Sequence, residues 1–219
     1  MKKMNRKHKN YLCISAGLLL LFLIWTVALC FVDVCQIGPK GTSVGFATVN
    51  QAVHDLTGVH LWLYVLTDWL GLVPVFLMMG FGLLGLIQWT KRKKLLKVDA
   101  DILVLGIFYV IVLALYLFFE AFIINYRPIL INNYLEASYP SSTTLLVLCV
   151  MPTAILQFHQ RIRSVALRWW VNGFLVAFTV FMVLGRLVSG VHWLSDIIGG
   201  AMLSGGLVML YVFVCLKGD

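Results

Sequence analysis

Long apolar stretches, separated by short polar or basic segments, dominate the pattern along the chain. A helix that crosses the apolar core of a bilayer needs about 20 mostly apolar residues. Five stretches reach this length and a sixth, Ser142–His159, lies at its lower end. The six are Tyr11–Val32, Leu61–Trp89, Ile102–Asn125, Ser142–His159, Trp169–Val188 and Trp193–Leu216. The pattern therefore predicts an all-α bundle of six transmembrane helices, in a single domain over residues 1–219.

The composition supports this interpretation. Apolar residues make up 61% of the sequence, charged residues only 12%, and the mean hydropathy is +0.95. Helices of soluble proteins keep a polar face, which these stretches lack. The first stretch is longer than the ~7–15 apolar residues of a signal peptide, so we interpret it as an uncleaved helix. The five cysteines have no paired or zinc-binding spacing and are interpreted as small apolar groups.

Basic residues are concentrated in alternate segments between the predicted spans. The N-terminus, the loops after the second and fourth spans and the C-terminus together hold 14 of the 17 Lys and Arg residues. The positive-inside rule places these segments, and so both termini, in the cytoplasm. The net charge of +8 then reflects topology and contact with anionic lipid. We expect no nucleic-acid partner, because no basic motif with stacking residues occurs.

Three basic residues fall on the outer side, against this bias: Lys40, Arg127 and Arg186. Arg186 belongs to the segment LGRLVSGVHWLSD, with His192 and Asp196. If the last helix begins at about residue 191, the imidazole and the carboxylate share one face. The carboxylate then accepts a hydrogen bond from one ring nitrogen and leaves the other free as a nucleophile or base. A structural His–Asp bridge that caps the helix is the alternative.

A run of hydroxyl residues, Ser141, Ser142, Thr143 and Thr144, opens the fourth span. Hydroxyls at the start of a helix usually serve as caps. The same helix start also presents backbone N–H groups to an anion. Because the planar guanidinium groups of two outer arginines suit phosphate oxygens, we expect an anion site at this face. Capping remains the alternative for each hydroxyl taken singly.

These residues carry a family resemblance. The pattern Arg186-x5-His192-x3-Asp196 resembles the third signature of the type-2 phosphatidic acid phosphatase superfamily, the lipid phosphate phosphatases. That signature has a serine where this chain has Gly185. Two shorter matches follow the same order along the chain. They are Arg127-Pro128, similar to the end of the first signature Lys-x6-Arg-Pro, and Pro140-Ser141, similar to the start of the second, Pro-Ser-Gly-His.

The resemblance implies a phosphohistidine mechanism at the outer face, with His192 as the nucleophile and Asp196 as the group that orients it. It implies no metal and no other cofactor. The phosphate ligands that it implies are Arg127, Arg186 and Ser141, to which we add Ser142 from the same hydroxyl run.

Two positions depart from the signatures. The lysine of the first signature falls at Glu120, and the histidine of the second falls at Thr143. At 1.5 Å rise per residue, Glu120 should lie about 10 Å below Arg127 on roughly the same helix face. Glu120 then either pairs with an arginine or is a protonated, structural carboxyl group.

Three residues of the first outer loop are candidates to replace part of what is missing. They are Lys40, His54 and His60, and the alternative for each is an ordinary solvated loop residue.

The sequence favours a multi-pass cell-membrane phosphatase that acts on a lipid phosphate or polyprenyl diphosphate at the outer face. The first alternative is a non-catalytic member that binds or carries anionic lipid, indicated by Glu120 and Thr143. The second is a transporter or channel that uses Asp68 and Glu120 as ion-pathway residues, although no broken-helix repeat accompanies them. No residue pattern selects one lipid or one oligomeric state.

Overall fold

The apolar stretches form helices, and the computed structural model describes residues 6–216 of the chain. Over that range the structure contains helices and isolated bridges but no β-strand. Two 3₁₀ turns cover Pro39–Gly41 and Leu95–Lys97. The α-helices are α1 (Arg6–Phe31), α2 (Ala47–Thr57), α3 (Leu61–Leu70), α4 (Leu72–Arg92), α5 (Ala100–Ala121), α6 (Ser142–Arg161), α7 (Val165–Val188) and α8 (Leu194–Leu216).

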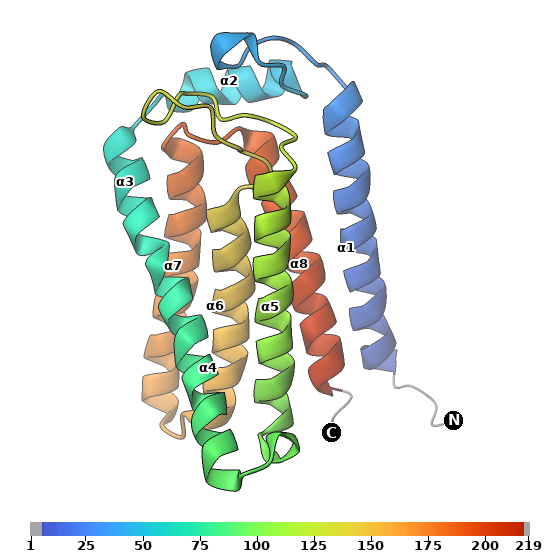
Figure 1. Ribbon diagram of the computed structural model, residues 1–219, viewed down its shortest axis with the longest axis vertical. Coiled ribbons are helices and arrows are strands. Elements are labelled where there is room, and N and C mark those ends of the chain that lie inside the picture. The colour runs from blue at the N-terminus through green and yellow to red at the C-terminus, as the bar shows by residue number, and fades with distance from the viewer. Residues whose placement is uncertain (1–5, 217–219) are drawn as a thin grey trace.

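The prediction of six spans is confirmed, because six helical segments are long and apolar enough to cross a membrane. The chain is therefore a multi-pass membrane protein. The second span consists of α3 and α4, which meet at Gly71. α1 begins and α8 ends at the same end of the bundle (Figure 1). The cytoplasmic location of that end stays a prediction from the charge pattern.

The third span ends earlier than the sequence predicts. α5 stops at Ala121, and Phe122 leaves the helical conformation with φ −106° and ψ 86°. The cause is tertiary pairing, because the Asn125 carbonyl accepts the Ser138 N–H at 2.9 Å and Tyr126 forms an isolated bridge with Ala137. Residues 122–126 thus pair with the returning loop, and Arg127 lies on that loop rather than on the helix above Glu120.

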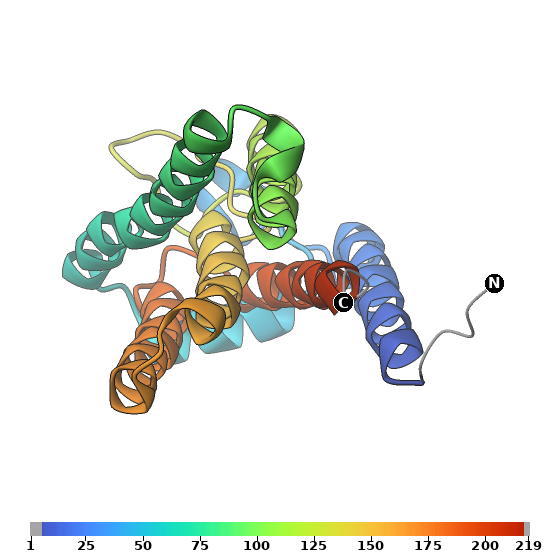
Figure 2. The same ribbon diagram turned by 90° about the horizontal axis from the view of Figure 1, so that it is seen from below.

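α8 lies between α1 on one side and α6 and α7 on the other (Figure 2). Small residues let α1 approach it closely. A Cβ atom on Gly206 would lie 2.7 Å from the Leu19 side chain, and the Ser15 hydroxyl donates to the Gly206 carbonyl at 2.8 Å. Small residues at helix contacts are the usual means of tight packing in a bilayer, where apolar burial alone drives little association.

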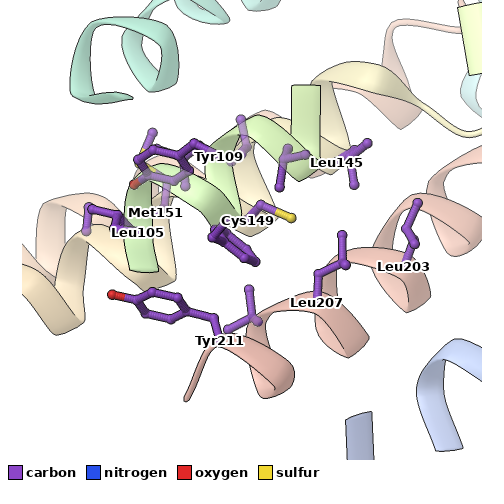
Figure 3. Close-up of a cluster of buried hydrophobic side chains, with 14 of the residues drawn as sticks. Leu105, Tyr109, Leu145, Cys149, Met151, Leu203, Leu207 and Tyr211 are labelled. Atoms are coloured by element: carbon purple, nitrogen blue, oxygen red, sulfur yellow. The ribbon is translucent and has the colours of Figure 1, made fainter. Parts of the chain in front are cut away.

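The centre of the bundle is an apolar cluster from α5, α6 and α8 (Figure 3). Polar groups inside it are paired, as the low dielectric requires. The Tyr109 hydroxyl lies 3.1 Å from Thr153 Oγ1, and Gln157 donates to the Tyr211 hydroxyl at 2.6 Å. Figure 3 labels Leu105, Tyr109, Leu145, Cys149, Met151, Leu203, Leu207 and Tyr211.

The other end of the bundle is covered by α2 and by the loop between α5 and α6 (Figure 1). Asn50 fixes α2 to the start of α8. Its amide donates to Ser195 Oγ at 2.9 Å, and its carbonyl oxygen accepts the Ser195 N–H at 3.0 Å. This end therefore has a defined roof above the start of α8.

We predict that Gly199→Ala destabilises the protein. A Cβ atom at position 199 would lie 2.5 to 2.8 Å from atoms of the Tyr139 ring, which is 1% exposed and hydrogen-bonded to Thr26 at 2.7 Å. Overpacking of this kind costs about 1–3 kcal/mol. Thermal unfolding in detergent measures it, with Gly17→Ala as control because no atom lies within 4 Å there. Equal unfolding temperatures for the two variants would contradict the packing described.

Candidate active site

The four residues expected to carry the chemistry come together at the roofed end of the bundle. Arg127 lies in the loop between α5 and α6, and Arg186 in the last turn of α7. His192 lies in the connection between α7 and α8, and Asp196 in the first turn of α8. All four are buried, with 8, 1, 2 and 0% of their surfaces exposed, respectively. Charged groups are rarely so covered unless other groups satisfy them.

The turn before α8 is fixed by backbone geometry. Gly190 has a φ of +71°, and a Cβ atom there would lie 2.2 Å from the Gly58 carbonyl oxygen. Only glycine fits this conformation in this space. α8 starts at Leu194 instead of about residue 191, because the Asp196 carboxylate accepts the Trp193 N–H at 2.8 Å and so caps the helix. His192 therefore precedes α8, and the expectation that both side chains share a helix face is wrong.

A third side chain joins the histidine to the aspartate. His192 Nδ1 lies 3.7 Å from Asp196 Oδ2, which is too long for a hydrogen bond. The Ser138 hydroxyl lies 3.2 Å from His192 Nδ1 and donates to Asp196 Oδ2. The other ring nitrogen, Nε2, is buried and has no hydrogen-bond partner within residues 6–216. The direct His–Asp hydrogen bond expected from the sequence is thus replaced by a bridge through Ser138.

The two arginines each face a carboxylate. Arg186 Nη1 lies 3.7 Å from Asp68 Oδ1, and Arg127 Nε lies 3.3 Å from Glu136 Oε2. Both guanidinium groups lie over the ring of Tyr64, with their central carbons 5.1 Å (Arg186) and 5.6 Å (Arg127) from its centroid.

Each guanidinium also keeps an unused donor. Arg186 Nε and Arg127 Nη1 are buried without a hydrogen-bond partner among the described residues. The two groups therefore have the capacity to bind an additional anion.

A pocket of about 600 Å³ opens beside the arginines. Arg127 and Arg186 line it, as do Ser142 and Thr143 of the hydroxyl run. Ser141 does not line it, since its N–H donates to the Asp196 carbonyl at 3.1 Å and its hydroxyl accepts from Thr144 at 3.0 Å. His192, which is buried, does not line it either. The pocket wall further includes Asp68, Gly71, Leu72, Tyr116, Glu120, Ile123, Leu135, Glu136, Ala137 and Leu146.

Comparison with known proteins identifies the family. The model of the PAP2 superfamily matches residues 73–217, more than half of the chain. This chain belongs to the PAP2 superfamily. The family predicted from the signature resemblance is therefore confirmed. No curated protein sequence matches the chain at a significant level.

A solved PAP2-type structure has the same fold. It is a transmembrane phosphatidylglycerolphosphate phosphatase from Bacillus subtilis, 19% identical to this chain, with a TM-score of 0.66. The alignment covers 94% of this chain and 97% of that protein. The likeness therefore extends over the whole bundle, including the α1 and α2 region that precedes the family match.

The two departures from the PAP2 signatures both lie on the pocket wall. Thr143 contributes a hydroxyl group where the signature has a histidine. Glu120 is exposed near the end of α5, and no ion pair joins it to an arginine in the described part of the chain. The carboxylates that do face the arginines are Asp68 and Glu136, which the sequence analysis had not assigned to the phosphate site.

The proposed replacements from the first outer loop do not line the pocket. Lys40 lies in the Pro39–Gly41 turn, and His60 Nε2 is 3.0 Å from the Thr57 carbonyl oxygen. The His54 ring packs against Trp193, with centroids 5.5 Å apart. An auxiliary role for these residues stays a prediction.

Ser138, Asp68 and Tyr64 are functional candidates that sequence reasoning missed. Ser138 stands two residues before the Pro140-Ser141 match, but nothing in its spacing links it to His192. In residues 6–216 no group of three His, Cys, Asp or Glu side chains suits a metal ion, and metal independence stays a prediction.

We predict that His192 stays neutral well below the usual titration range of histidine. Its pKa lies well below the ordinary value, because burial disfavours the imidazolium form and the Arg186 and Arg127 guanidinium groups repel it. The main-chain carbonyl of Ser138 acts in the opposite sense. Because the pKa is lowered in the folded state, the unfolded chain takes up this proton first as the pH falls. The contribution of neutral His192 to the free energy of unfolding is therefore complete above about pH 6.5 and is lost as the pH falls towards the folded-state pKa.

Nuclear magnetic resonance of ¹⁵N-labelled histidine in detergent, with His192→Gln to assign the signal, measures this titration. A midpoint at or above about 6.5 would contradict the electrostatic account of the site.

Proposed function

We propose that this PAP2 protein is a metal-independent phosphatase of the cell membrane that acts on a lipid phosphate or diphosphate at the outer face. The observation that carries the proposal is the state of His192. One ring nitrogen is held by Ser138, and the other is unpaired beside two guanidinium groups with unused donors. A neutral, oriented imidazole next to anion-binding cations is what nucleophilic attack on phosphorus requires.

The first event in the proposed reaction is an exchange of anions at the arginines. The substrate phosphate enters the pocket and takes the places of the Asp68 and Glu136 carboxylates at Arg186 and Arg127. The contacts that are given up, 3.7 Å for Arg186–Asp68 and 3.3 Å for Arg127–Glu136, are longer than the ~2.7–2.9 Å of a charge-assisted hydrogen bond, so a phosphate bound bidentately at the usual distance gains by the exchange. Because His192 does not line the pocket, the reaction also requires the phosphate to pass the lining residues and reach Nε2.

The chemical steps follow from the free Nε2 lone pair. Nε2 attacks phosphorus, the bond from phosphorus to the leaving oxygen breaks, and that oxygen departs with the electron pair. The phosphohistidine formed carries the phosphoryl group and a positive ring. Water then attacks phosphorus, the N–P bond breaks, and inorganic phosphate leaves with His192 restored to its neutral form.

The alternative is a non-catalytic PAP2 member that binds anionic lipid. Glu120 and Thr143 favour it, because they remove a cation and an acid from the family pattern. Phosphate release by purified protein separates the two, and binding without release would support the alternative.

We expect His192→Ala to abolish phosphate release and Asp196→Asn to slow it by orders of magnitude. The first change removes the nucleophile, and the second removes the group that orients it. Release from a panel of lipid monophosphates and diphosphates measures the effect, and acid-labile ³²P labelling of the wild type detects the phosphohistidine. His159→Ala, on the exposed end of α6, is the matched control and should retain activity. Wild-type turnover by His192→Ala would remove the enzyme assignment.

We further predict faster hydrolysis of prenyl diphosphates than of phosphatidic acid. General acid catalysis typically contributes about 10²–10⁴-fold, and threonine cannot supply it near neutral pH. A monophosphate ester expels an alkoxide, a strongly basic leaving group whose conjugate acid is about as weak an acid as water. A diphosphate expels a phosphate monoester with a second pKa of about 6, which leaves readily without a donated proton.

The test compares kcat/KM for the two substrates in the wild type and in Thr143→Val and Thr143→His. Thr143→His should raise monophosphate turnover more than diphosphate turnover. Thr143→Val should not reduce the difference in kcat/KM between the two substrates. Equal or faster hydrolysis of phosphatidic acid by the wild type would overturn the predicted preference.

A further inference from the structure

Ser138 is held in place independently of its side chain. It is 2% exposed, and its N–H donates to the Asn125 carbonyl at 2.9 Å. The neighbouring residue Tyr139 is 1% exposed, and its hydroxyl is hydrogen-bonded to Thr26 Oγ1 of α1 at 2.7 Å. The hydroxyl of Ser138 thus reaches His192 and Asp196 from a backbone that the surrounding fold fixes.

The direction of the two hydrogen bonds follows from the number of protons available. Asp196 Oδ2 already accepts the Trp193 N–H at 2.8 Å, which identifies this oxygen as an acceptor. The Ser138 hydroxyl has one proton, and it donates that proton to Asp196 Oδ2. Its oxygen therefore has only lone pairs to offer His192 Nδ1, 3.2 Å away. The ring must carry its proton on Nδ1, so the lone pair lies on Nε2.

We propose that Ser138 is the positioning residue that couples Asp196 to His192. Asp196 acts on the ring through the serine hydroxyl rather than by direct contact, since its Oδ2 stays 3.7 Å from Nδ1. The consequence for catalysis rests on the proposed function. When Nε2 takes the phosphoryl group, the ring becomes positive. The carboxylate then stabilises that charge through two hydrogen bonds in series, from Nδ1–H to the Ser138 hydroxyl and from the hydroxyl to Asp196.

The decisive experiment is a double-mutant cycle. Ser138→Ala keeps the main-chain carbonyl near the ring but removes the link to Asp196. Supporting groups that orient a functional histidine are typically worth about 10–100-fold, so we expect kcat to fall by that factor with KM nearly unchanged. In an Asp196→Asn background, the same change should alter kcat by less than about twofold, because residues that act as one unit are not additive.

Two further variants test specificity. Ser15→Ala also removes a buried hydroxyl, one that bonds a carbonyl between α1 and α8, and it should leave kcat unchanged. Ser138→Thr keeps the hydroxyl and should recover most of the activity lost in Ser138→Ala. An equal loss from Ser138→Ala in both backgrounds, or no loss in either, would overturn the coupling.

A second readout does not depend on turnover. ¹⁵N shifts of His192 report the tautomer directly, and wild type should show the proton on Nδ1, whereas Ser138→Ala should show a mixture of both forms. If the wild type hydrolyses no lipid phosphate, the proposed function fails, yet these shifts still decide the role of Ser138. A wild-type ring protonated on Nε2, or an unchanged tautomer in Ser138→Ala, would overturn it.

Discussion

The burial of one carboxylate, Asp196, sets the geometry of the whole roofed end. A carboxylate removed from water is costly unless donors surround it. Its Oδ2 accepts the Trp193 N–H and the Ser138 hydroxyl, while its main-chain oxygen accepts the Ser141 N–H. One residue therefore fixes the start of α8, the loop between α5 and α6, and the start of α6. The positions of the histidine and of the pocket wall depend on these bonds.

The sequence predicts well what depends on local composition. Six spans follow from hydrophobic length, and the two outer arginines and the His192 segment stand out because they break the membrane pattern. It predicts less well what depends on contacts between distant segments. The end of α5 at Ala121 is decided by pairing of Asn125 with Ser138, 13 residues later.

The bridge between His192 and Asp196 has the same origin. Their spacing predicted a direct hydrogen bond. Because Asp196 caps α8 at Trp193, the helix begins after His192, and Ser138 from the loop between α5 and α6 lies between the two side chains. Asp68 and Tyr64 reach the arginines from α3, which no motif connects to them. The residue types of the candidate site can thus be predicted from the sequence, whereas the groups that contact them depend on tertiary structure.

The changed signature positions redistribute charge and do not simply delete it. The PAP2 pattern has a lysine at position 120 and a histidine at 143, and this chain has a carboxylate and a hydroxyl there. The pocket wall thus carries three carboxyl groups around its two arginines, those of Glu120, Asp68 and Glu136. A phosphate group binds to such a wall only if it competes successfully with these carboxyl groups for the guanidinium donors. We therefore expect the leaving group and the headgroup to matter for the choice of substrate.

On the proposed function, the two arginine–carboxylate pairs would also affect the end of the catalytic cycle. Asp68 and Glu136 are attached to the wall, so their local concentration beside Arg186 and Arg127 is fixed and does not depend on the medium. As inorganic phosphate dissociates, these carboxylates would return to the guanidinium groups and compete against its rebinding. Product departure would then be assisted from within the pocket, and free phosphate in the surrounding solution would inhibit the enzyme only weakly.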